Sequence, residues 1–438
     1  MNRRLFGTDG VRGVANDDIT PELAIGLARS AGALVDGVAL IGRDTRRSGP
    51  MLSAALHAGF NSVGIDTVDL GIIPVGAVSR LTREVGARYG VMVSASHNPA
   101  PDNGIKFFGR DGSKLDDDAE LAIEDGFGRT HEPALGHYIG LQTTMSDSLD
   151  RYLAFLQYKA QYSLRGVELA IDCANGAAFA AAPRLFEQLK ADFEVYAADP
   201  DGTNINDGCG ATHPEMLAAK ASGRIGLAFD GDADRLIAID ENGEVVNGDV
   251  LMAIVATHLK ENGKLEGNTV VATVMSNLGF HQAMKRAGID VVETGVGDRY
   301  VLEAMKERKA VIGGEQSGHI VLEDRTTGDG LLSAVRLLDI VAATGKPLSE
   351  LRTVMTEFPQ VLQNVRVSDK DGLADASAVW AAVADAERDL GDSGRVLVRA
   401  SGTEPLVRVM VEAEDEPTAR TVATSLSGVV VGALGELS

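Results

Sequence analysis

The stretch Tyr89-Gly90-Val91-Met92-Val93-Ser94-Ala95-Ser96-His97-Asn98-Pro99 joins an apolar run to a short polar loop. Five mostly apolar residues in a row, followed by turn-forming residues, are typical of a strand buried on both faces of a parallel sheet. Open α/β sheets bind their ligands at the carboxyl edge of the strands. The stretch therefore predicts an α/β fold with a nucleophilic hydroxyl at that edge, able to attack a carbonyl or a phosphoryl group.

Length and composition limit the class of protein. The chain has 438 residues, 45% of them hydrophobic, a formal net charge of −22 and two cysteines. About three domains are expected at this length. The acidic balance argues against a general nucleic-acid partner, and two cysteines are too few for a disulfide framework. With no apolar run near the ~20 residues of a membrane span and no signal-like amino terminus, we expect a cytoplasmic protein without a membrane partner.

Three segments repeat one pattern, in which an apolar strand is followed by a helix. The strands are residues 38–42, 167–172 and 269–274. Alternating strands and helices favour largely parallel sheets, so we expect three related α/β domains with mixed, largely parallel sheets. From about residue 364 the pattern changes to strand, helix, two adjacent strands and helix, which predicts a small α+β domain. The expected domains are residues 1–152, 153–253, 254–362 and 363–438.

The segment Asp230-Gly231-Asp232-Ala233-Asp234-Arg235 carries three alternating carboxylates. Carboxylate oxygens are the ligands that Mg²⁺ and Ca²⁺ prefer. A calcium loop of the EF-hand type is a rival interpretation, because Glu241 falls at the twelfth position. Arg235 stands where that loop needs glycine, and the flanking residues 225–229 and 236–239 predict strands rather than helices. The segment therefore favours Mg²⁺, which takes further ligands from water or phosphate.

The segment Arg399-Ala400-Ser401-Gly402-Thr403-Glu404-Pro405, with Arg408 beyond it, combines hydroxyls, a glycine and two arginines. Free backbone amides, hydroxyls and guanidinium groups together bind phosphate well. An ordinary hairpin turn also uses serine and glycine, but it does not need arginine inside an apolar strand. The segment therefore predicts a phosphate cradle.

A further glycine-rich loop, Gly313-Gly314-Glu315-Gln316-Ser317-Gly318-His319, follows a predicted strand at residues 310–312. Its carboxylate and hydroxyl suit the recognition of sugar hydroxyls or of an amine, although a plain glycine-rich turn is equally consistent with the pattern. Basic residues also recur beside glycines at predicted strand ends, which indicates a shared phosphate-rich cleft. These segments are residues 6–13, 43–46, 103–106 and 297–300.

A serine nucleophile, a metal loop and a separate phosphate cradle favour phosphoryl transfer over acyl transfer. The Gly-x-Ser-x-Gly elbow of acyl-transfer enzymes is missing, and so is the Walker A motif of nucleotide-dependent kinases. A serine that holds phosphate covalently, next to a cradle for a second phosphate, is the arrangement expected of a mutase.

The motifs at residues 5–13, 94–99, 230–235, 314–319 and 399–408, in this order, resemble the α-D-phosphohexomutase superfamily. Within it they are most similar to the bacterial branch that acts on glucosamine phosphates. The resemblance implies three related α/β domains and a C-terminal domain arranged around a central cleft. It also implies an isomerase that interconverts glucosamine 6-phosphate and glucosamine 1-phosphate through a phosphoserine and glucosamine 1,6-bisphosphate, supplying amino sugar for cell-wall synthesis.

The resemblance also implies residue roles. Ser96 carries the phosphate, and one Mg²⁺ is bound by Asp230, Asp232, Asp234 and an oxygen of phosphorylated Ser96. The residues implied near the reacting phosphate, with Lys106 and His97 as candidates for proton transfer, are Arg12, His97, Lys106 and Arg235. The residues implied in binding the sugar and its second phosphate are Glu315, Ser317, His319, Arg399, Ser401, Gly402, Thr403 and Arg408.

Two alternatives remain. A superfamily member could prefer glucose or mannose phosphates, and a binding or regulatory relative could carry an inactive site. The intact serine, aspartates and cradle argue against the second alternative, and phosphate on Ser96 would distinguish an enzyme from a binder. The oligomeric state is left open between a monomer and a homodimer.

Overall fold

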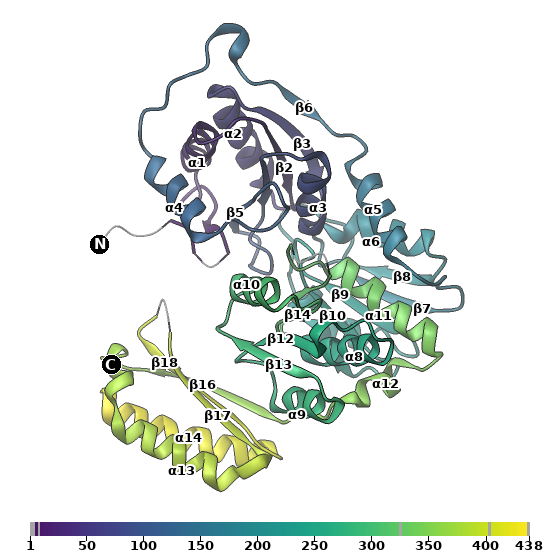
Figure 1. The fold of residues 1–438 in the computed structure, drawn as a ribbon, viewed down its shortest axis with the longest axis vertical. Coiled ribbons are helices and arrows are strands. Elements are labelled where there is room, and N and C mark those ends of the chain that lie inside the picture. Colours follow the sequence, from purple (N-terminus) through teal and green to yellow (C-terminus); the bar gives the residue numbers. More distant parts are fainter. Residues whose placement is uncertain (1–4, 8, 324–325, 402–403, 436–438) are drawn as a thin grey trace. The chain divides into compact units, whose positions relative to one another are not determined.

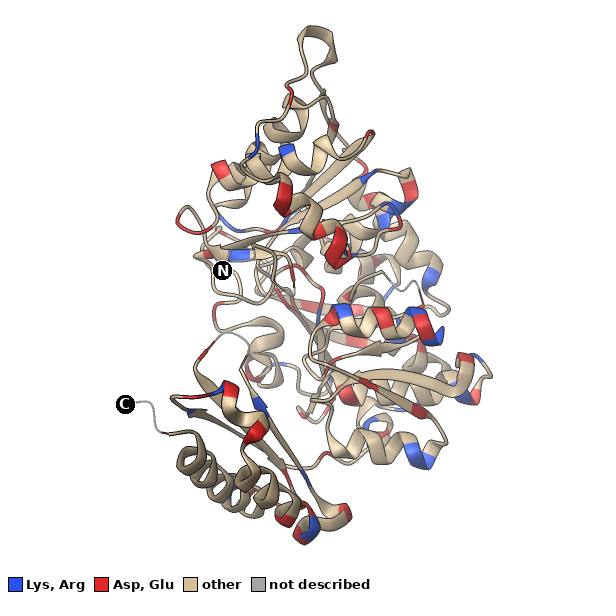
Figure 2. Cartoon of the chain, turned by 60° about the vertical axis from the view of Figure 1, so that its left-hand side comes forward, with Lys and Arg blue, Asp and Glu red and all other residues tan. Residues whose placement is uncertain are grey.

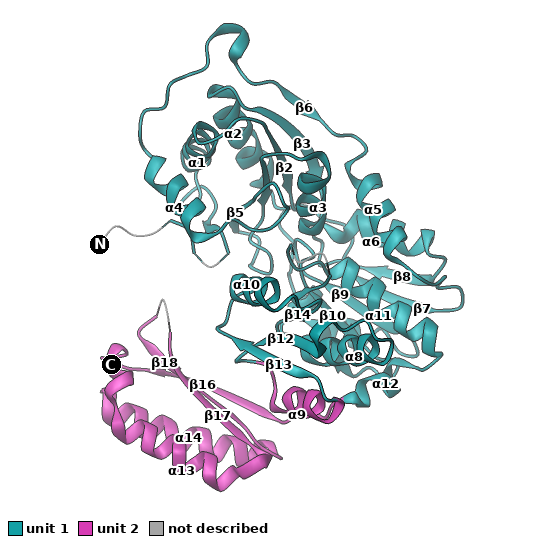
Figure 3. Ribbon diagram, in the orientation of Figure 1, with its two compact units in different colours: residues 1–275, 288–354 teal, residues 276–287, 355–438 magenta. Residues whose placement is uncertain are grey.

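The computed structural model describes residues 5–7, 9–323, 326–401 and 404–435. These residues divide into two compact units (Figure 3). The first contains residues 1–275 and 288–354, and the second contains residues 276–287 and 355–438. Acidic residues are distributed over helices and loops of both units (Figure 2). Within the described part of the chain, no helix is long and apolar enough to cross a membrane.

The first sheet has six strands and carries the serine loop (Figure 1). Its order is β1-β5-β4-β2-β3-β6; β2, β3, β4 and β6 run parallel, whereas β5 is antiparallel to both β4 and β1. The strands are β1 (Val11–Val14), β2 (Val38–Arg43), β3 (Asp66–Ile72), β4 (Tyr89–Val93), β5 (Asp102–Phe108) and β6 (Gln142–Thr144). The helices of this part are α1 (Pro21–Ala33), α2 (Gly49–Ser62), α3 (Val75–Val85) and α4 (Asp117–Gly126).

The strand β4 is buried at all five positions, which explains its continuous apolar sequence. It lies between β2 and β5, and Val91, Met92 and Val93 are fully buried. Burial of a side chain of this size stabilises the fold by about 1.5–3 kcal/mol. The loop at residues 94–99 is therefore anchored on a rigid central strand.

The second sheet has five strands in the order β11-β10-β9-β7-β8. Its strands are β7 (Glu168–Asp172), β8 (Asp192–Tyr196), β9 (Ile225–Phe229), β10 (Leu236–Ile239) and β11 (Val245–Val246), with helices α5 (Ser148–Lys159), α6 (Ala178–Gln188) and α7 (Pro214–Ala218). The strands β9 and β10 form an antiparallel pair around residues 230–235. The prediction of flanking strands is confirmed. The EF-hand interpretation is wrong, because an EF-hand places helices on both sides of its loop.

The third sheet has four strands in the order β13-β12-β14-β15. They are β12 (Thr269–Thr273), β13 (Asp290–Thr294), β14 (Gly313–Gly314) and β15 (Ile320–Val321). The helices are α8 (Gly248–Glu261), α9 (Leu278–Ala287), α10 (Asp298–Arg308), α11 (Gly330–Thr344) and α12 (Leu348–Leu351). The predicted strand at residues 310–312 is wrong, since the ladder begins at Gly313. A Cβ at Gly313 would lie 3.0 Å from the backbone oxygen of Val271, so this close strand pairing requires glycine.

The three sheets share one topology. In each, the first strand of the repeat pairs in parallel with the second on one side and the third on the other, and a fourth pairs antiparallel with the third. These cores are β3-β2-β4-β5, β8-β7-β9-β10 and β13-β12-β14-β15. The prediction of three related α/β domains with mixed sheets is confirmed.

The fourth sheet is antiparallel throughout and lies in the second unit. Its order is β16-β18-β17, with β16 (Gln360–Arg366), β17 (Arg395–Ala400), β18 (Leu406–Glu412) and helices α13 (Ser377–Leu390) and α14 (Glu416–Leu434). Helix α9 belongs to the same unit, where the Leu278 amide donates to Glu412 Oε2 at 2.9 Å. The predicted α+β domain with two adjacent antiparallel strands is confirmed.

Candidate active site

The serine, aspartate and glycine-rich motifs occupy the same place in the three repeats. Residues 94–101 connect β4 to β5, residues 230–235 connect β9 to β10, and residues 315–319 connect β14 to β15. Each loop therefore links the third strand of its repeat to the antiparallel fourth strand. The repeated topology thus places the three predicted site motifs on equivalent loops.

Ser96 meets the aspartate loop directly. Its Oγ donates to Asp230 Oδ2 at 2.6 Å and lies 3.4 Å from Asp234 Oδ1. Ser96 has a φ of 52° and is 1% exposed. Left-handed backbone at a non-glycine residue is strained, and such strain gathers at functional sites. The structure therefore brings the predicted nucleophile and the predicted metal loop together.

The three aspartates form a compact buried cluster. One carboxylate oxygen from each of Asp230, Asp232 and Asp234 lies within 4.8 Å of the others. Burial, together with the carboxylates of Asp234 and Asp232, raises the pKa of Asp230 well above its usual value. Among the described residues, Asp232 Oδ1 is buried without a hydrogen-bond partner. Three hard oxygen donors with one unsatisfied atom fit a divalent cation such as Mg²⁺.

Lys106 supplies positive charge to this cluster of carboxylates. Its Nζ lies 2.9 Å from Asp232 Oδ2, 3.1 Å from Asp9 Oδ2 and 3.5 Å from Asp234 Oδ2. Burial raises the pKa of Asp234, but Lys106, His319 and Arg235 outweigh burial and lower it. Asp234 is therefore held ionised even though it is buried.

His97 lies beside Ser96, and Arg12 and Arg235 lie near His97. His97 Nδ1 is 3.4 Å from Ser96 Oγ. Burial, with Arg235 and Arg12 nearby, lowers the pKa of His97 to about 4. The imidazole is consequently neutral near pH 7 and has a lone pair available. Arg12 pairs with Asp9, and Arg235 Nε lies 3.8 Å from Asp234 Oδ1.

The glycine-rich loop at residues 315–319 contacts the same group of residues. Arg235 forms an isolated β-bridge with His319, whose Nε2 lies 3.9 Å from Asp234 Oδ2. Ser317 Oγ lies 3.4 Å from Glu315 Oε2, and Glu315 Oε1 accepts the Gly297 amide at 3.1 Å. The structure thus joins this loop to the aspartate loop, with Glu315 and Ser317 side by side.

Three residues absent from the predicted site belong to this network. Lys114 pairs with both Asp9 and Asp298, and Asp298 Oδ2 lies 3.6 Å from His319 Nε2. Asp9 and Asp298 lie in two of the basic segments that indicated a phosphate-rich cleft. That prediction rested on the arginines of these segments and not on their aspartates. Lys114 follows no motif, since its partners lie 105 and 184 positions away.

Two arginines of the predicted phosphate-rich cleft have other partners. Arg46 is fully buried, and its guanidinium donates to backbone carbonyls of the serine loop. Arg299 pairs with Glu120 at 2.7 Å and with Asp117. Arg46 therefore contributes nothing to the phosphate-rich cleft that its segment was expected to help form, because its guanidinium N–H groups donate to acceptors inside the fold.

The segment predicted to form a phosphate cradle, residues 399–408, lies in the second unit. Arg399 on β17 and Arg408 on β18 face each other directly in the ladder. Burial and the charge of Arg408 lower the pKa of Arg399. Like charges directly opposite each other destabilise a sheet, and Glu404 Oε2 lies 4.0 Å from Arg408 Nη2. Ser401 is buried next to this pair in sequence, and Gly402 and Thr403 lie outside the described residues.

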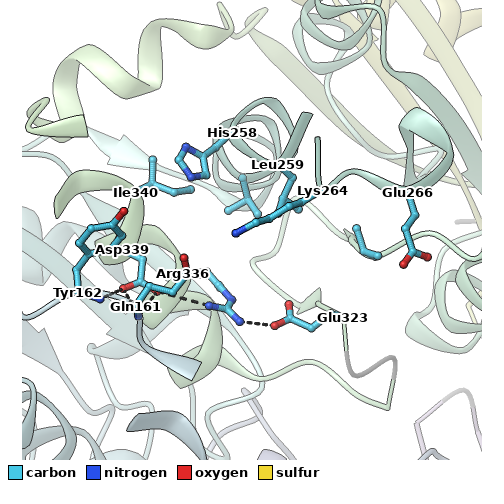
Figure 4. A pocket seen from close by; sticks show the side chains of 12 residues that line it. Gln161, Tyr162, His258, Leu259, Lys264, Glu266, Glu323, Arg336, Asp339 and Ile340 are labelled. Carbon is cyan, nitrogen blue, oxygen red and sulfur yellow. Dashed lines mark hydrogen bonds and ion pairs between the residues drawn. The ribbon is translucent and has the colours of Figure 1, made fainter. Parts of the chain in front are cut away.

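A separate cavity of about 280 Å³ is lined by α8, α11 and the segment after α5 (Figure 4). Its acidic residues already have partners, because Glu323 pairs with Arg336 and Asp339 accepts the backbone amides of Gln161 and Tyr162. None of the sequence-predicted site residues lines it. This cavity is therefore separate from the candidate active site.

Comparison with known proteins defines the class first. The phosphoglucomutase/phosphomannomutase families match along the chain: alpha/beta/alpha domain I at residues 3–134, domain II at 150–243, domain III at 247–358 and the C-terminal domain at 362–428. A phosphoglucomutase/phosphomannomutase family protein from Burkholderia thailandensis shares the fold, with a TM-score of 0.82, 24% identity and coverage of 100% of this chain and 99% of the other. An N-acetylphosphoglucosamine mutase from Aspergillus fumigatus, solved with GlcNAc-6P and magnesium, gives a TM-score of 0.70 at 18% identity, covering 98% and 96%.

Full-length relatives narrow the class further. The chain is 52% identical to the phosphoglucosamine mutase of Rhodococcus erythropolis, over 98% of this chain and 99% of the relative. It is 50% identical to the phosphoglucosamine mutase of Bacillus subtilis, over 94% of each. The chain therefore belongs to the phosphoglucosamine mutase family of phosphohexomutase isomerases.

Proposed function

We propose that this enzyme interconverts glucosamine 6-phosphate and glucosamine 1-phosphate through phosphorylated Ser96. The observation that carries the proposal is the 2.6 Å hydrogen bond from Ser96 Oγ to Asp230, inside a cluster of three buried carboxylates. A hydroxyl next to a candidate metal site is suited to carry a phosphoryl group, because a bound cation would neutralise the charge of that group. The names of the full-length relatives supply the sugar.

The reaction takes place in two half-reactions. O1 of glucosamine 6-phosphate attacks the phosphorus of phospho-Ser96, the bond from phosphorus to Oγ breaks, and glucosamine 1,6-bisphosphate forms. The bisphosphate turns around, Ser96 Oγ attacks its 6-phosphate, and glucosamine 1-phosphate leaves. The proton of the attacking hydroxyl is lost in each half-reaction, and the departing oxygen gains one.

Asp230, Asp232 and Asp234 would hold Mg²⁺, with an oxygen of phosphorylated Ser96. The cation would neutralise charge on the transferring phosphoryl group. Lys106, Arg12 and Arg235 would add positive charge around the same phosphate, which is the main form of catalysis available to phosphoryl transfer.

Proton transfer is proposed for His97 or Lys106, which differ in their surroundings. His97 is the neutral base next to Ser96 Oγ. Lys106 is enclosed by three carboxylates, an arrangement that suits neutralising charge more than accepting a proton. The geometry therefore favours His97 for the proton and Lys106 for electrostatic stabilisation.

Substrate recognition is proposed for the remaining residues. Glu315 offers a carboxylate to the sugar amine or a hydroxyl, with Ser317 and His319 beside it. The opposed Arg399 and Arg408 would bind the phosphate that does not react, together with Ser401, Gly402 and Thr403. We further propose the four domains at residues 1–152, 153–253, 254–362 and 363–438, a cytoplasmic location, and catalysis by a monomer or a homodimer.

The experiment compares kcat/KM for glucosamine 6-phosphate and glucose 6-phosphate, with Mg²⁺ and a trace of each 1,6-bisphosphate. A preference of about 100-fold for glucosamine, or about 2.7 kcal/mol in the transition state, is the expected result. Equal or reversed values would instead place the enzyme with mutases for glucose or mannose phosphates.

A further inference from the structure

The backbone of Ser96 is held on both sides by residues that have no part in the proposed chemistry. Its φ of 52° is a conformation that a non-glycine residue keeps only when its surroundings enforce it. The Ser96 amide donates to Ser94 Oγ at 2.9 Å. The Ser96 carbonyl accepts from Arg46 and from Asn206, at 3.0 and 2.9 Å.

All the guanidinium donors of Arg46 are used by Asp44 and by backbone carbonyls of residues 96–102. A guanidinium has five N–H donors, and here each has an acceptor. Nε donates to Asp44 Oδ2 at 2.9 Å, and Nη2 donates to the carbonyls of Ser96 and Asn98. Nη1 donates to the carbonyls of Pro99 and Asp102. With no donor left and no exposed surface, Arg46 acts on the loop rather than on a ligand.

Asp44 connects the two sides of Ser96. Its Oδ2 accepts both Arg46 Nε and the hydroxyl of Ser94, the latter at 2.7 Å. The Ser94 oxygen in turn accepts the Ser96 amide. A single buried ion pair, Asp44–Arg46 at 2.9 Å, therefore controls both the amide and the carbonyl of Ser96.

Asn206 holds the same carbonyl from the second α/β domain. Its Nδ2 donates to the Ser96 carbonyl at 2.9 Å and to the Asn98 carbonyl at 3.0 Å. Both neighbours are acceptors, so the amide nitrogen must face them. Asn206 follows β8 in the chain and lies 110 positions from Ser96.

We infer that Arg46 and Asn206 are positioning residues for phosphoryl transfer, which fix Ser96 in its left-handed conformation and aim its Oγ at Asp230. This inference rests on the proposed role of Ser96 as the phosphate carrier. Neither residue contacts the sugar in this assignment. Their loss therefore lowers the rate of transfer and leaves the binding of sugar phosphate unchanged.

The variants Asn206→Gly and Asn206→Asp test the inference. Glycine removes the side chain and tolerates the φ of 58° at this position, whereas aspartate keeps the shape and removes the donor. Asn204→Gly is the matched control, because among the described residues the Asn204 side chain hydrogen-bonds only to the backbone of Asp199 and Asp201 in its own loop. We measure kcat, KM for glucosamine 6-phosphate, and the single-turnover rate at which glucosamine 1,6-bisphosphate phosphorylates Ser96.

Both Asn206 variants are expected to lower kcat and the phosphorylation rate by about 10- to 100-fold, since small misplacements of a reacting group cost this much. KM is expected to change by less than about twofold, because only an interaction used in transfer is lost. Asn204→Gly is expected to match the wild type. Wild-type phosphorylation rates in both Asn206 variants, or a loss that appears in KM alone, would overturn the inference.

The wild-type enzyme separates this inference from the proposed function. If glucosamine 1,6-bisphosphate does not phosphorylate wild-type Ser96, the proposed function itself fails. If the wild type is phosphorylated and the Asn206 variants are phosphorylated equally fast, only the positioning role fails. Arg46→Lys, which keeps the charge but loses the fork of donors, is expected to lose kcat in the same way. The Asn206 variants decide the question if Arg46→Lys does not fold.

Discussion

Ser96 Oγ lies 2.6 Å from Asp230 Oδ2, across 134 positions of the chain. The two residues stand on equivalent loops of the first and second repeats, each between a third and a fourth strand. The shared topology of the two repeats thus brings the candidate nucleophile of the first against the candidate metal site of the second. The third copy adds His319, whose backbone pairs with that of Arg235.

Gly231 belongs to the aspartate loop and packs against the backbone of Ser96. Gly231→Ala is therefore predicted to displace Ser96. A Cβ at this position would lie 2.5 Å from the Ser96 carbonyl oxygen and 2.9 Å from Ile205 Cδ1. The loops must then move apart, and we expect kcat to fall by about 100-fold. Steady-state kinetics check this. Gly428→Ala on helix α14 is the control, because outside the backbone of its own helix turn no described atom lies within 4 Å of that Cβ, and it should keep full activity. A fully active Gly231→Ala enzyme would show that the loops tolerate displacement.

Asp232→Asn is predicted to weaken metal binding. Asp232 Oδ1 is buried and without a hydrogen-bond partner among the described residues, which is consistent with the proposed role of this carboxylate as a metal ligand. We expect Mg²⁺ affinity to fall by at least the ~10- to 100-fold that loss of an outer-shell partner costs. Isothermal titration of the purified protein with Mg²⁺ measures this directly. The exposed Asp207→Asn should bind Mg²⁺ as the wild type does. Equal affinity in Asp232→Asn would exclude Asp232 as a ligand.

Removal of the metal is predicted to destabilise the first unit. Three buried carboxylates then repel one another with only Lys106 and the nearby arginines to offset them. At a concentration of about 100 Kd, Mg²⁺ should stabilise the fold by about 2.7 kcal/mol. Thermal unfolding with chelator and with Mg²⁺ checks the shift, and Ca²⁺ in place of Mg²⁺ tests selectivity. An identical Tm with chelator and with Mg²⁺ would contradict a metal site at this cluster.

Asp172 is predicted to make stability depend on pH. Burial raises the pKa of Asp172 from 3.8 to about 6, although the amides of Gly210 and Ala174 donate to it. A carboxyl with a raised folded pKa binds its proton more tightly when folded, so its contribution is present below about pH 4 and is lost towards pH 6. The loss amounts to about 3 kcal/mol for a shift of about two units.

Denaturant unfolding of the wild type and Asp172→Asn at about pH 4 and about pH 7 isolates this effect. Asparagine does not titrate, so the difference in unfolding free energy should shift in favour of Asp172→Asn as the pH rises. The loss of one accepted hydrogen bond in Asp172→Asn affects both pH values equally. A pH-independent difference would show that Asp172 titrates normally.

The sequence predicted those parts of the site in which chemistry and local pattern coincide. Ser96 follows a strand that is apolar at every buried position, and three alternating aspartates sit between two apolar strands. Side chains of this kind are costly to bury without a function, so a single segment suffices to mark them. The antiparallel C-terminal sheet was predicted from a different pattern, two adjacent strands flanked by helices.

The contacts between distant segments could not be predicted in this way. Lys114 reaches Asp298 across 184 positions, and no local pattern distinguishes it from a surface lysine. Arg46 belongs in sequence to a basic segment at a strand end, one of those that indicated a phosphate-rich cleft. Only the fold shows that backbone carbonyls of residues 96–102 use its donors. The strand at Gly313 was misplaced because glycine has low strand propensity, and close packing on Val271 overrides that preference.

The most direct measurement of the central claim follows phosphate onto and off Ser96. The protein is incubated with glucosamine 1,6-bisphosphate, the mass of the intact chain is recorded, and the modified residue is located by peptide mapping. We predict one phosphate on Ser96, which glucosamine 6-phosphate removes at least as fast as kcat. A folded Ser96→Ala protein should take up no phosphate and should lack turnover. A phosphate on another residue, or wild-type turnover in Ser96→Ala, would contradict the account.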